Sequence, residues 1–345
     1  MTAAVSQSRL PVAATWRKGI ARLMDIILHV GAHRSGSTSF QHYLRCNRAH
    51  LMHDGTTVWE PHMLRTGLFN GLFAAPHVMN GRDLQRRAMG RVRIHALRAQ
   101  NEGAKRLLIS EENMIGAPRA CLRAGMLYPA IGERLARLGA TFEGRIARVV
   151  MTIRAQDIWW SSVAAFGVGR GHAVPDATRL AAFSSAPRTW RDVITDMAFA
   201  LPETEIRILP FEQFAGRSDA VLSTAIDRPV PYGHAASWLN RSPDTAKLRS
   251  TLAQYQGASN ALPSHLAQGE GRWNPFTPLQ AANLREAYAD DIMWLTAGAD
   301  GLATLTEDPS RKRAGQSLPS GALTKGQSHD QQNNTCLKGR LAQTG

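Results

Sequence analysis

At 345 residues the chain is long enough for one large α/β domain, and its 43% hydrophobic and 20% charged residues are ordinary for a globular protein. No apolar run approaches the ~18 residues of a membrane span, and the first residues lack the apolar core of a secretory signal. The formal net charge of +14 favours an anionic ligand: a nucleic acid, an acidic membrane surface or a polyanionic nucleotide. The basic residues are spread along the chain and not gathered in one arm, which weakens the nucleic-acid interpretation.

The domain organisation follows from composition. Residues 1–23 read as a flexible leader, residues 24–306 as one α/β domain, and residues 307–345 as a disordered tail rich in Ser, Gly, Gln and Asn. Met24 stands directly before the first strand-like run, so the sequence leaves open whether translation starts at Met1 or at Met24.

The cysteines indicate the compartment. Cys46, Cys121 and Cys336 are too few and too scattered for a disulfide framework or a zinc cluster. We therefore expect a cytoplasmic protein without a metal.

Buried β-runs alternate with helix-compatible segments along the chain. Strands are predicted over residues 25–31, 105–110, 145–154 and 205–210. Such alternation predicts a P-loop-like, three-layer α/β domain, in which a central parallel sheet of four to five strands is flanked by helices and binds ligands at its carboxyl edge. The helices are expected over residues 37–45, 81–100, 122–138, 188–200 and 279–295.

The first turn has the spacing of a phosphate-binding loop. Residues 31–38 (GAHRSGST) follow GxxxxG-x-[ST] between a strand and a helix, where backbone N–H groups can surround an anion. An NTP-binding loop needs lysine directly after the second glycine, and this position is Ser37. The cation stands instead at Arg34, where it can brace a phosphosulfate group. The turn therefore disfavours ordinary NTP chemistry.

The segment IILHVGAHRSGSTSFQ resembles the 5′-phosphosulfate-binding loop of sulfotransferases that use 3′-phosphoadenosine 5′-phosphosulfate (PAPS), particularly the bacterial members. The resemblance implies that Arg34, Ser35, Gly36, Ser37 and Thr38 hold the phosphosulfate. Cytosolic members more often carry lysine at the position of Arg34.

The same family implies a second signature, a strand that ends in arginine with serine eight residues later, which binds the 3′-phosphate. VVMTIRAQDIWWSS supplies Arg154 and Ser162, with Ser161 as a neighbour whose role depends on the helix phase. A guanidinium suits this role because its planar fork donates two hydrogen bonds to one phosphate. Trp159 and Trp160 are expected in the core or at a subunit contact.

Sulfuryl transfer also needs a base for the acceptor proton. The run LLISEENMIG places Glu111 and Glu112 after a strand, and bacterial relatives carry an S-x-E element at a comparable point, so the resemblance selects Glu112. Neighbouring carboxylates raise one another's pKa, which suits a base working near neutrality. Glu111 and His172 are the alternatives, and both acids could instead cap the next helix.

Other polar residues receive weaker assignments. His29 alternates within the first strand and is expected to be buried structure, whereas His33 belongs to the loop without a clear role. Arg170 could contact the acceptor. Arg272, within residues 269–276, could belong to a basic loop over the nucleotide or to a plain turn.

Together these patterns predict an enzyme that transfers a sulfuryl group from PAPS, without a metal, to a hydroxyl or amine of a carbohydrate, lipid or small metabolite. The acceptor and the oligomeric state stay open, because acceptor pockets lie in variable loops such as residues 167–176. A nucleotide or small-molecule kinase, or a non-catalytic nucleic-acid-binding protein, is the alternative.

Overall fold

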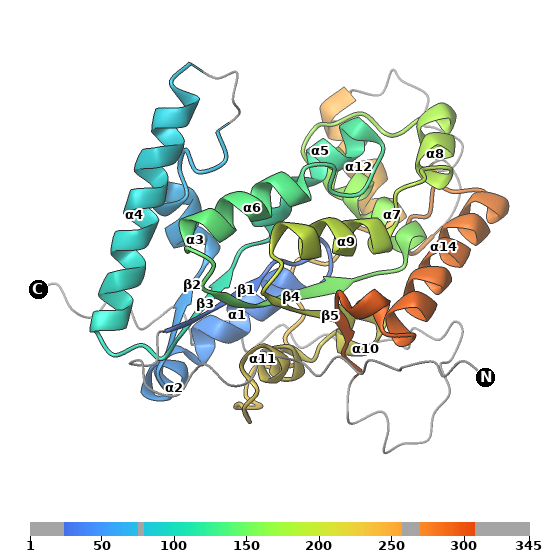
Figure 1. Ribbon diagram of the computed structural model, residues 1–345. Coiled ribbons are helices and arrows are strands. Elements are labelled where there is room, and N and C mark those ends of the chain that lie inside the picture. The colour runs from blue at the N-terminus through green and yellow to red at the C-terminus, as the bar shows by residue number, and fades with distance from the viewer. Residues whose placement is uncertain (1–23, 75–78, 257–265, 267–269, 308–345) are drawn as a thin grey trace, which may run out of the picture.

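A computed structural model describes residues 24–74, 79–256, 266 and 270–307. Six strands form its centre: β1 (Asp25–His29), β2 (Thr56–Trp59), β3 (Arg106–Ser110), β4 (Ile146–Ile153), β5 (Glu205–Pro210) and β6 (Thr304–Leu305). They build one sheet in the order β2-β3-β1-β4-β5-β6 (Figure 1). Every pair is parallel, with Asp25 opposite Arg106 between β1 and β3, and Arg148 opposite Glu205 between β4 and β5.

The predicted α/β fold with a central parallel sheet is confirmed, and the sheet is larger than the four or five strands expected. The two additional strands, β2 and β6, occupy the two edges. They contain four and two residues. Runs this short carry no recognisable apolar pattern, so pairing with a neighbour defines them.

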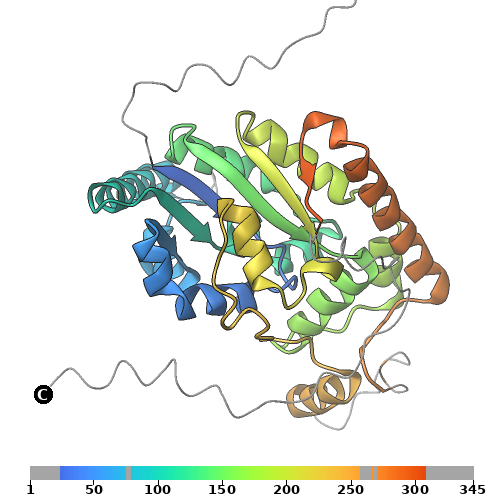
Figure 2. The same ribbon diagram turned by 90° about the horizontal axis from the view of Figure 1, so that it is seen from below.

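Helices cover both faces of the sheet. In Figure 2 the blue helices α1 and α2 and the yellow helix α11 lie over one face. This layer consists of α1 (Ser37–Cys46), α2 (Arg48–His53), α10 (Phe211–Phe214) and α11 (Ser218–Ile226). The other side carries α3 (Pro61–Met63), the π-helix η2 (Leu64–Leu68), α4 (Gly81–Asn101), α5 (Pro118–Ala124), α6 (Ile131–Thr141), α7 (Gln156–Val168), α8 (Ala177–Ser184), α9 (Trp190–Ala200), α12 (Thr245–Gln256) and α14 (Pro278–Thr296), with short 3₁₀ turns at η3 (Glu112–Ile115) and η4 (Ala299–Gly301).

The first strand shows why the chain folds this way. Ile26 and Leu28 pack into the large core cluster beneath α4, α6, α7 and α9, whereas Ile27 faces the cluster formed by α1 and α11. Alternate side chains of a strand point to opposite faces, so a continuous apolar run indicates burial on both sides. Trp159 and Trp160 are fully buried in the large cluster, which confirms their expected place in the core.

One predicted helix proved to be two. The stretch 122–138 is divided between α5 and α6. Gly125 ends α5 in the left-handed region, with φ +70°, and Pro129 follows before α6 begins. A left-handed glycine closely followed by proline is a strong helix stop.

Among the described residues, no helix combines the length and the apolar character needed to cross a membrane. The predicted leader, all of the predicted tail except Glu307, and Gly269 of the predicted basic loop lie outside the described residues.

Candidate functional site

A cavity of about 520 Å³ opens at the carboxyl edge of the sheet. The turns after β1, β4 and β5 line it together with residues 238–244 and 271–272. Parallel sheets bind ligands at this edge because loops and helix N-termini converge there. The lining includes residues 34–38, Glu112 and Arg154 of the predicted site.

The turn between β1 and α1 is shaped as a loop around the helix N-terminus. Gly31 has φ +99° and Gly36 has φ +87°, a region that side chains with a Cβ rarely adopt. At Gly31 a Cβ would also come within 3.0 Å of the Cβ of Glu112. The loop is tied to β4, because the Ala32 N–H donates to the carbonyl of Thr152 at 2.8 Å. The positive end of the α1 dipole therefore faces the cavity, where it favours an anion.

Arg154, the residue that follows β4, is almost wholly buried at the cavity wall, with 5% exposure. Its Nη1 donates to the carbonyl of Arg34 at 2.9 Å, and its guanidinium lies over the ring of Phe211. Burial, and then the positive charge of Arg272, lower the pKa of Arg154 to about 10. The side chain stays cationic at neutral pH, without a described carboxylate in ion-pair contact.

Arg34 joins the two sequence signatures. Its Nε donates to the hydroxyl of Ser162 at 3.1 Å, and its Nη2 donates to the hydroxyl of Ser242 at 3.2 Å and to the carbonyl of Asn240 at 3.0 Å. Ser162 therefore lies behind Arg34, outside the lining of the cavity, and its described partners are Arg34 and Ser242. Ser161 donates to the carbonyl of Asp157 in its own helix, so Ser162 is the one of the two neighbouring serines that contacts Arg34.

Two residues that line the cavity each have a buried polar side-chain atom without a hydrogen-bond partner among the described residues. These atoms are the Oγ of Ser35 in the loop and the Nε of Arg154. Buried donors are almost always paired, and each unpaired donor costs about 1–3 kcal/mol. Their shared location beside a helix N-terminus indicates a place for an anionic ligand.

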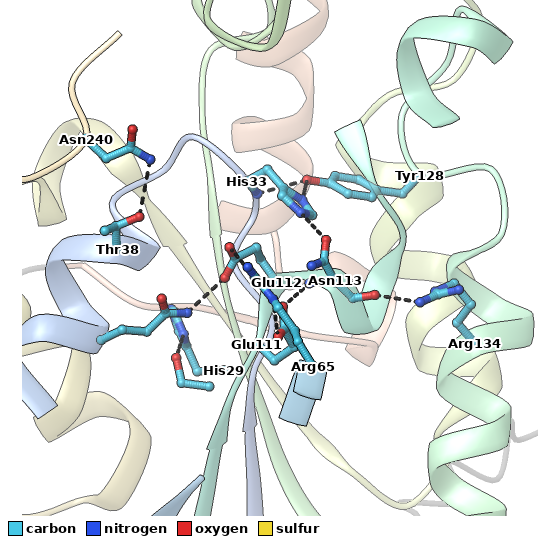
Figure 3. A network of polar contacts seen from close by, with 12 residues as sticks. His29, His33, Thr38, Arg65, Glu111, Glu112, Asn113, Tyr128, Arg134 and Asn240 are labelled. Atoms are coloured by element: carbon cyan, nitrogen blue, oxygen red, sulfur yellow. Dashed lines mark hydrogen bonds and ion pairs between the residues drawn. The ribbon is translucent and has the colours of Figure 1, made fainter. Parts of the chain in front are cut away.

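The two glutamates after β3 differ in role. Glu111 is 2% exposed, makes a bidentate ion pair with Arg65 and caps η3 by accepting from the N–H of Asn113 at 2.8 Å. Glu112 faces the cavity; Oε2 accepts from the amide of Gln41 at 2.9 Å and Oε1 from Arg65 at 3.0 Å (Figure 3). This arrangement agrees with a structural Glu111 and leaves Glu112 as the carboxylate that a ligand can reach.

The expectation that the acidic pair raises the pKa of its base is wrong for Glu112. Burial acts in that direction, but the charge that His33 gains in acid, the hydrogen bonds from the backbone and from Gln41, and the charge of Arg65 outweigh it, so the pKa of Glu112 lies below its usual value. Arg65 makes an ion pair with each of the two carboxylates, and no sequence motif marks this arginine. Glu112 is consequently ionised at neutral pH.

The histidines of the first strand and turn are neutral structural groups. His29 is buried, with its Nδ1 2.9 Å from the hydroxyl of Ser110, as expected of a core residue. His33 is held between the hydroxyl of Tyr128, 3.0 Å from its Nδ1, and the side-chain oxygen of Asn113, 3.1 Å from its Nε2 (Figure 3). Desolvation lowers the pKa of each histidine to about 4.

The remaining candidates separate into two groups. Arg272 lines the cavity, with Asp244 as its partner in an isolated antiparallel bridge, so it lies where the predicted basic loop should be. His172 and Arg170 lie after α7, outside the lining of the cavity. Arg170 is exposed and stacks on Phe166, which does line the cavity.

Residues 238–244 cover the loop, and no sequence motif marks them. The Asn240 amide donates to the hydroxyl of Thr38 at 3.4 Å (Figure 3). The Leu239 N–H donates to the hydroxyl of Ser39 at 2.9 Å. The available signal was a polar, turn-forming stretch, NRSPD, after an exposed tryptophan. Such composition indicates a loop but not which surface the loop covers.

The elements that meet at this edge are thus a left-handed glycine loop, a buried guanidinium whose Nε has no described partner, a second arginine and an ionised carboxylate. The sequence matches no known family and shows no significant similarity to a curated protein, so the chemistry of the cavity carries the functional assignment.

Proposed function

We propose that the protein is a PAPS-dependent sulfotransferase. The observation that carries the proposal is the pair of buried, unpartnered donors, Ser35 Oγ and Arg154 Nε, on two residues that line a cavity together with Arg34 and Arg272. Such donors fit a ligand with several phosphate or sulfate oxygens, because charge-assisted hydrogen bonds are the strong ones. None of the described lining residues is a lysine, which agrees with the absence of the Walker lysine from the loop.

In this proposal the loop at residues 34–38 and the N-terminus of α1 bind the phosphosulfate end, and Arg154 binds the 3′-phosphate. PAPS supplies a sulfuryl group whose S–O bond to phosphate breaks as the acceptor oxygen or nitrogen bonds to sulfur. Glu112 takes the acceptor proton; it is ionised and held in place by Gln41 and Arg65. Arg34 provides positive charge beside the phosphate that is released, and Ser162 and Ser242 orient its guanidinium.

The lowered pKa of Glu112 has a consequence for this chemistry. A weaker base gains less from accepting a proton, so its contribution comes mainly from position and from the charge it carries. Arg65 holds Glu111 and Glu112 at once, and it is one of the groups that lower the pKa of Glu112. The proposal therefore assigns Arg65 a positioning role.

Calorimetric titration of the full chain with 3′-phosphoadenosine 5′-phosphate tests the proposal. Adenosine 5′-monophosphate is the matched control, since it lacks only the 3′-phosphate. We expect the bisphosphate to bind at least about 10-fold more tightly, because one charge-assisted hydrogen bond contributes roughly 1.5–3 kcal/mol. No binding of the bisphosphate would overturn the proposal.

The same titration separates the two other classes of protein. Tighter binding of ATP that requires Mg²⁺ would favour a kinase. Binding of an oligonucleotide with a steep loss of affinity in salt would favour a nucleic-acid-binding protein.

A further inference from the structure

A second cluster of chemically active side chains lies at the other end of helix α1. His42 and Cys46 are one helical turn apart on α1, and His234 approaches them from the chain after α11. One potential ligand atom from each residue lies within 4.8 Å of the other two. The sequence predicted no metal cluster because the third ligand is far along the chain.

We infer that His42, Cys46 and His234 form a binding site for Zn²⁺ or a similar transition-metal ion. Tetrahedral zinc with bonds of about 2.0–2.3 Å holds neighbouring N and S ligands roughly 3.6 Å apart. The Sγ of Cys46 is already 3.6 Å from the Nε2 of His42. His234 is exposed, and one of its ring nitrogens already lies within 4.8 Å of the ligand atoms of His42 and Cys46.

The ligand set suits this metal. Thiolate and imidazole select zinc-like ions over magnesium or calcium, which prefer oxygen. Three protein ligands leave a fourth position for water. On binding, the Cys46 thiol gives its proton to solvent and the metal–sulfur bond forms. The positive charge of Arg45, the residue before Cys46, opposes the binding of a cation.

The backbone around His234 presents this side chain to α1. His234 has φ +65°, which is uncommon for histidine. The segment is fastened to α1 by two bonds: the Tyr43 hydroxyl donates to the carbonyl of Pro231 at 2.6 Å, and the Asn47 amide donates to the carbonyl of Gly233 at 3.1 Å. The ligand-bearing turn is therefore held against the helix by contacts that do not involve the ligands.

The site has a structural consequence. His234 begins the stretch that leads to residues 238–244, which cover the cavity. A metal bound here clamps this stretch to α1, the helix whose N-terminus forms the phosphate loop. Bound metal should therefore slow tryptic cleavage after the exposed Arg241. The inference does not depend on the proposed function.

The test uses the full chain after treatment with a chelator. Titration with Co²⁺ should give one ion per chain and a thiolate-to-cobalt charge-transfer band. Cys46→Ser should abolish this band, and His234→Asn, which tolerates the left-handed backbone, should weaken Co²⁺ and Zn²⁺ binding by more than about 10-fold. Cys336→Ser and His53→Asn, which replace a cysteine outside the described residues and an exposed histidine on α2, should change neither.

Metal content by mass spectrometry and the rate of cleavage after Arg241 are independent of sulfuryl transfer. Failure of the 3′-phosphoadenosine 5′-phosphate titration would thus leave this site untouched. Less than stoichiometric Co²⁺, or an unchanged charge-transfer band in Cys46→Ser, would overturn the inference.

Discussion

Replacement of Arg154 by methionine should weaken ligand binding strongly but change the stability of the fold little. If Arg154 binds a phosphate of the ligand, Arg154→Met removes at least one charge-assisted hydrogen bond, worth roughly 1.5–3 kcal/mol. The affinity for 3′-phosphoadenosine 5′-phosphate should then fall by about 10- to 150-fold. Methionine keeps much of the apolar volume and a favourable sulfur contact with Phe211.

The ligand-free protein should lose little stability from the same change. Burial, followed by the charge of Arg272, lowers the pKa of Arg154 to about 10, which corresponds to a cost of about 3 kcal/mol for keeping the cation in the fold. The buried cation lowers the free energy of unfolding at every pH below about 10, because the folded state holds the Arg154 proton less firmly than the unfolded chain does. The lost bond to the Arg34 carbonyl costs a similar roughly 1.5–3 kcal/mol, so the free energy of unfolding should change by only about 1 kcal/mol.

Calorimetric titration measures the first effect, and urea unfolding without ligand measures the second. Arg170→Met is the matched control, because Arg170 also stacks on an aromatic ring but is exposed and outside the cavity lining. It should change neither quantity. Undiminished affinity in Arg154→Met, or a loss of stability above about 3 kcal/mol, would refute the reasoning.

Three further predictions address the base, the loop and the buried histidines. Glu112→Gln should bind 3′-phosphoadenosine 5′-phosphate normally yet lose about 100-fold or more in sulfuryl transfer, as expected of a general base; unchanged turnover would move the base to Glu111 or His172. Gly36→Ala should lower the free energy of unfolding by about 1–2 kcal/mol, because Gly36 has φ +87°. Gly90→Ala, in the middle of α4, should raise it by about 1 kcal/mol. If urea unfolding shows that both changes shift the free energy of unfolding in the same direction, the loop geometry is contradicted. Because the pKa of His29 is lowered to about 4, the unfolded chain binds the His29 proton at a higher pH than the folded protein does, and stability should decline as the pH falls from about 6.5 towards 4. In thermal melts, the melting temperature of His29→Gln should depend less on pH over this range. An identical pH dependence in the two proteins would exclude His29 as the cause.

Sequence patterns identified the parts of the site that arise locally. The run before Gly31, the glycine spacing and the strand that ends at Arg154 could be read directly, because burial of a strand and the turn after it depend on adjacent residues. Their convergence was also predictable in outline, since parallel strands end at one edge of the sheet. The prediction of Glu112 as a residue facing the cavity follows from the same rule.

Long-range contacts decided the remaining features. Arg65 reaches both glutamates from a π-helix with no sequence signature, and with His33 and Gln41 it contributes to the lowered pKa of Glu112. Ser162 contacts Arg34, because the phase of α7 and the position of Ser242 orient both side chains.

The sequence by itself determined the parallel α/β fold and the glycine loop, because apolar periodicity and left-handed turns are encoded over a few neighbouring residues. Only the tertiary structure decided which charges share the cavity and which loop covers it. Those relations join residues that are distant along the chain, and electrostatic and packing energies depend on distance in space.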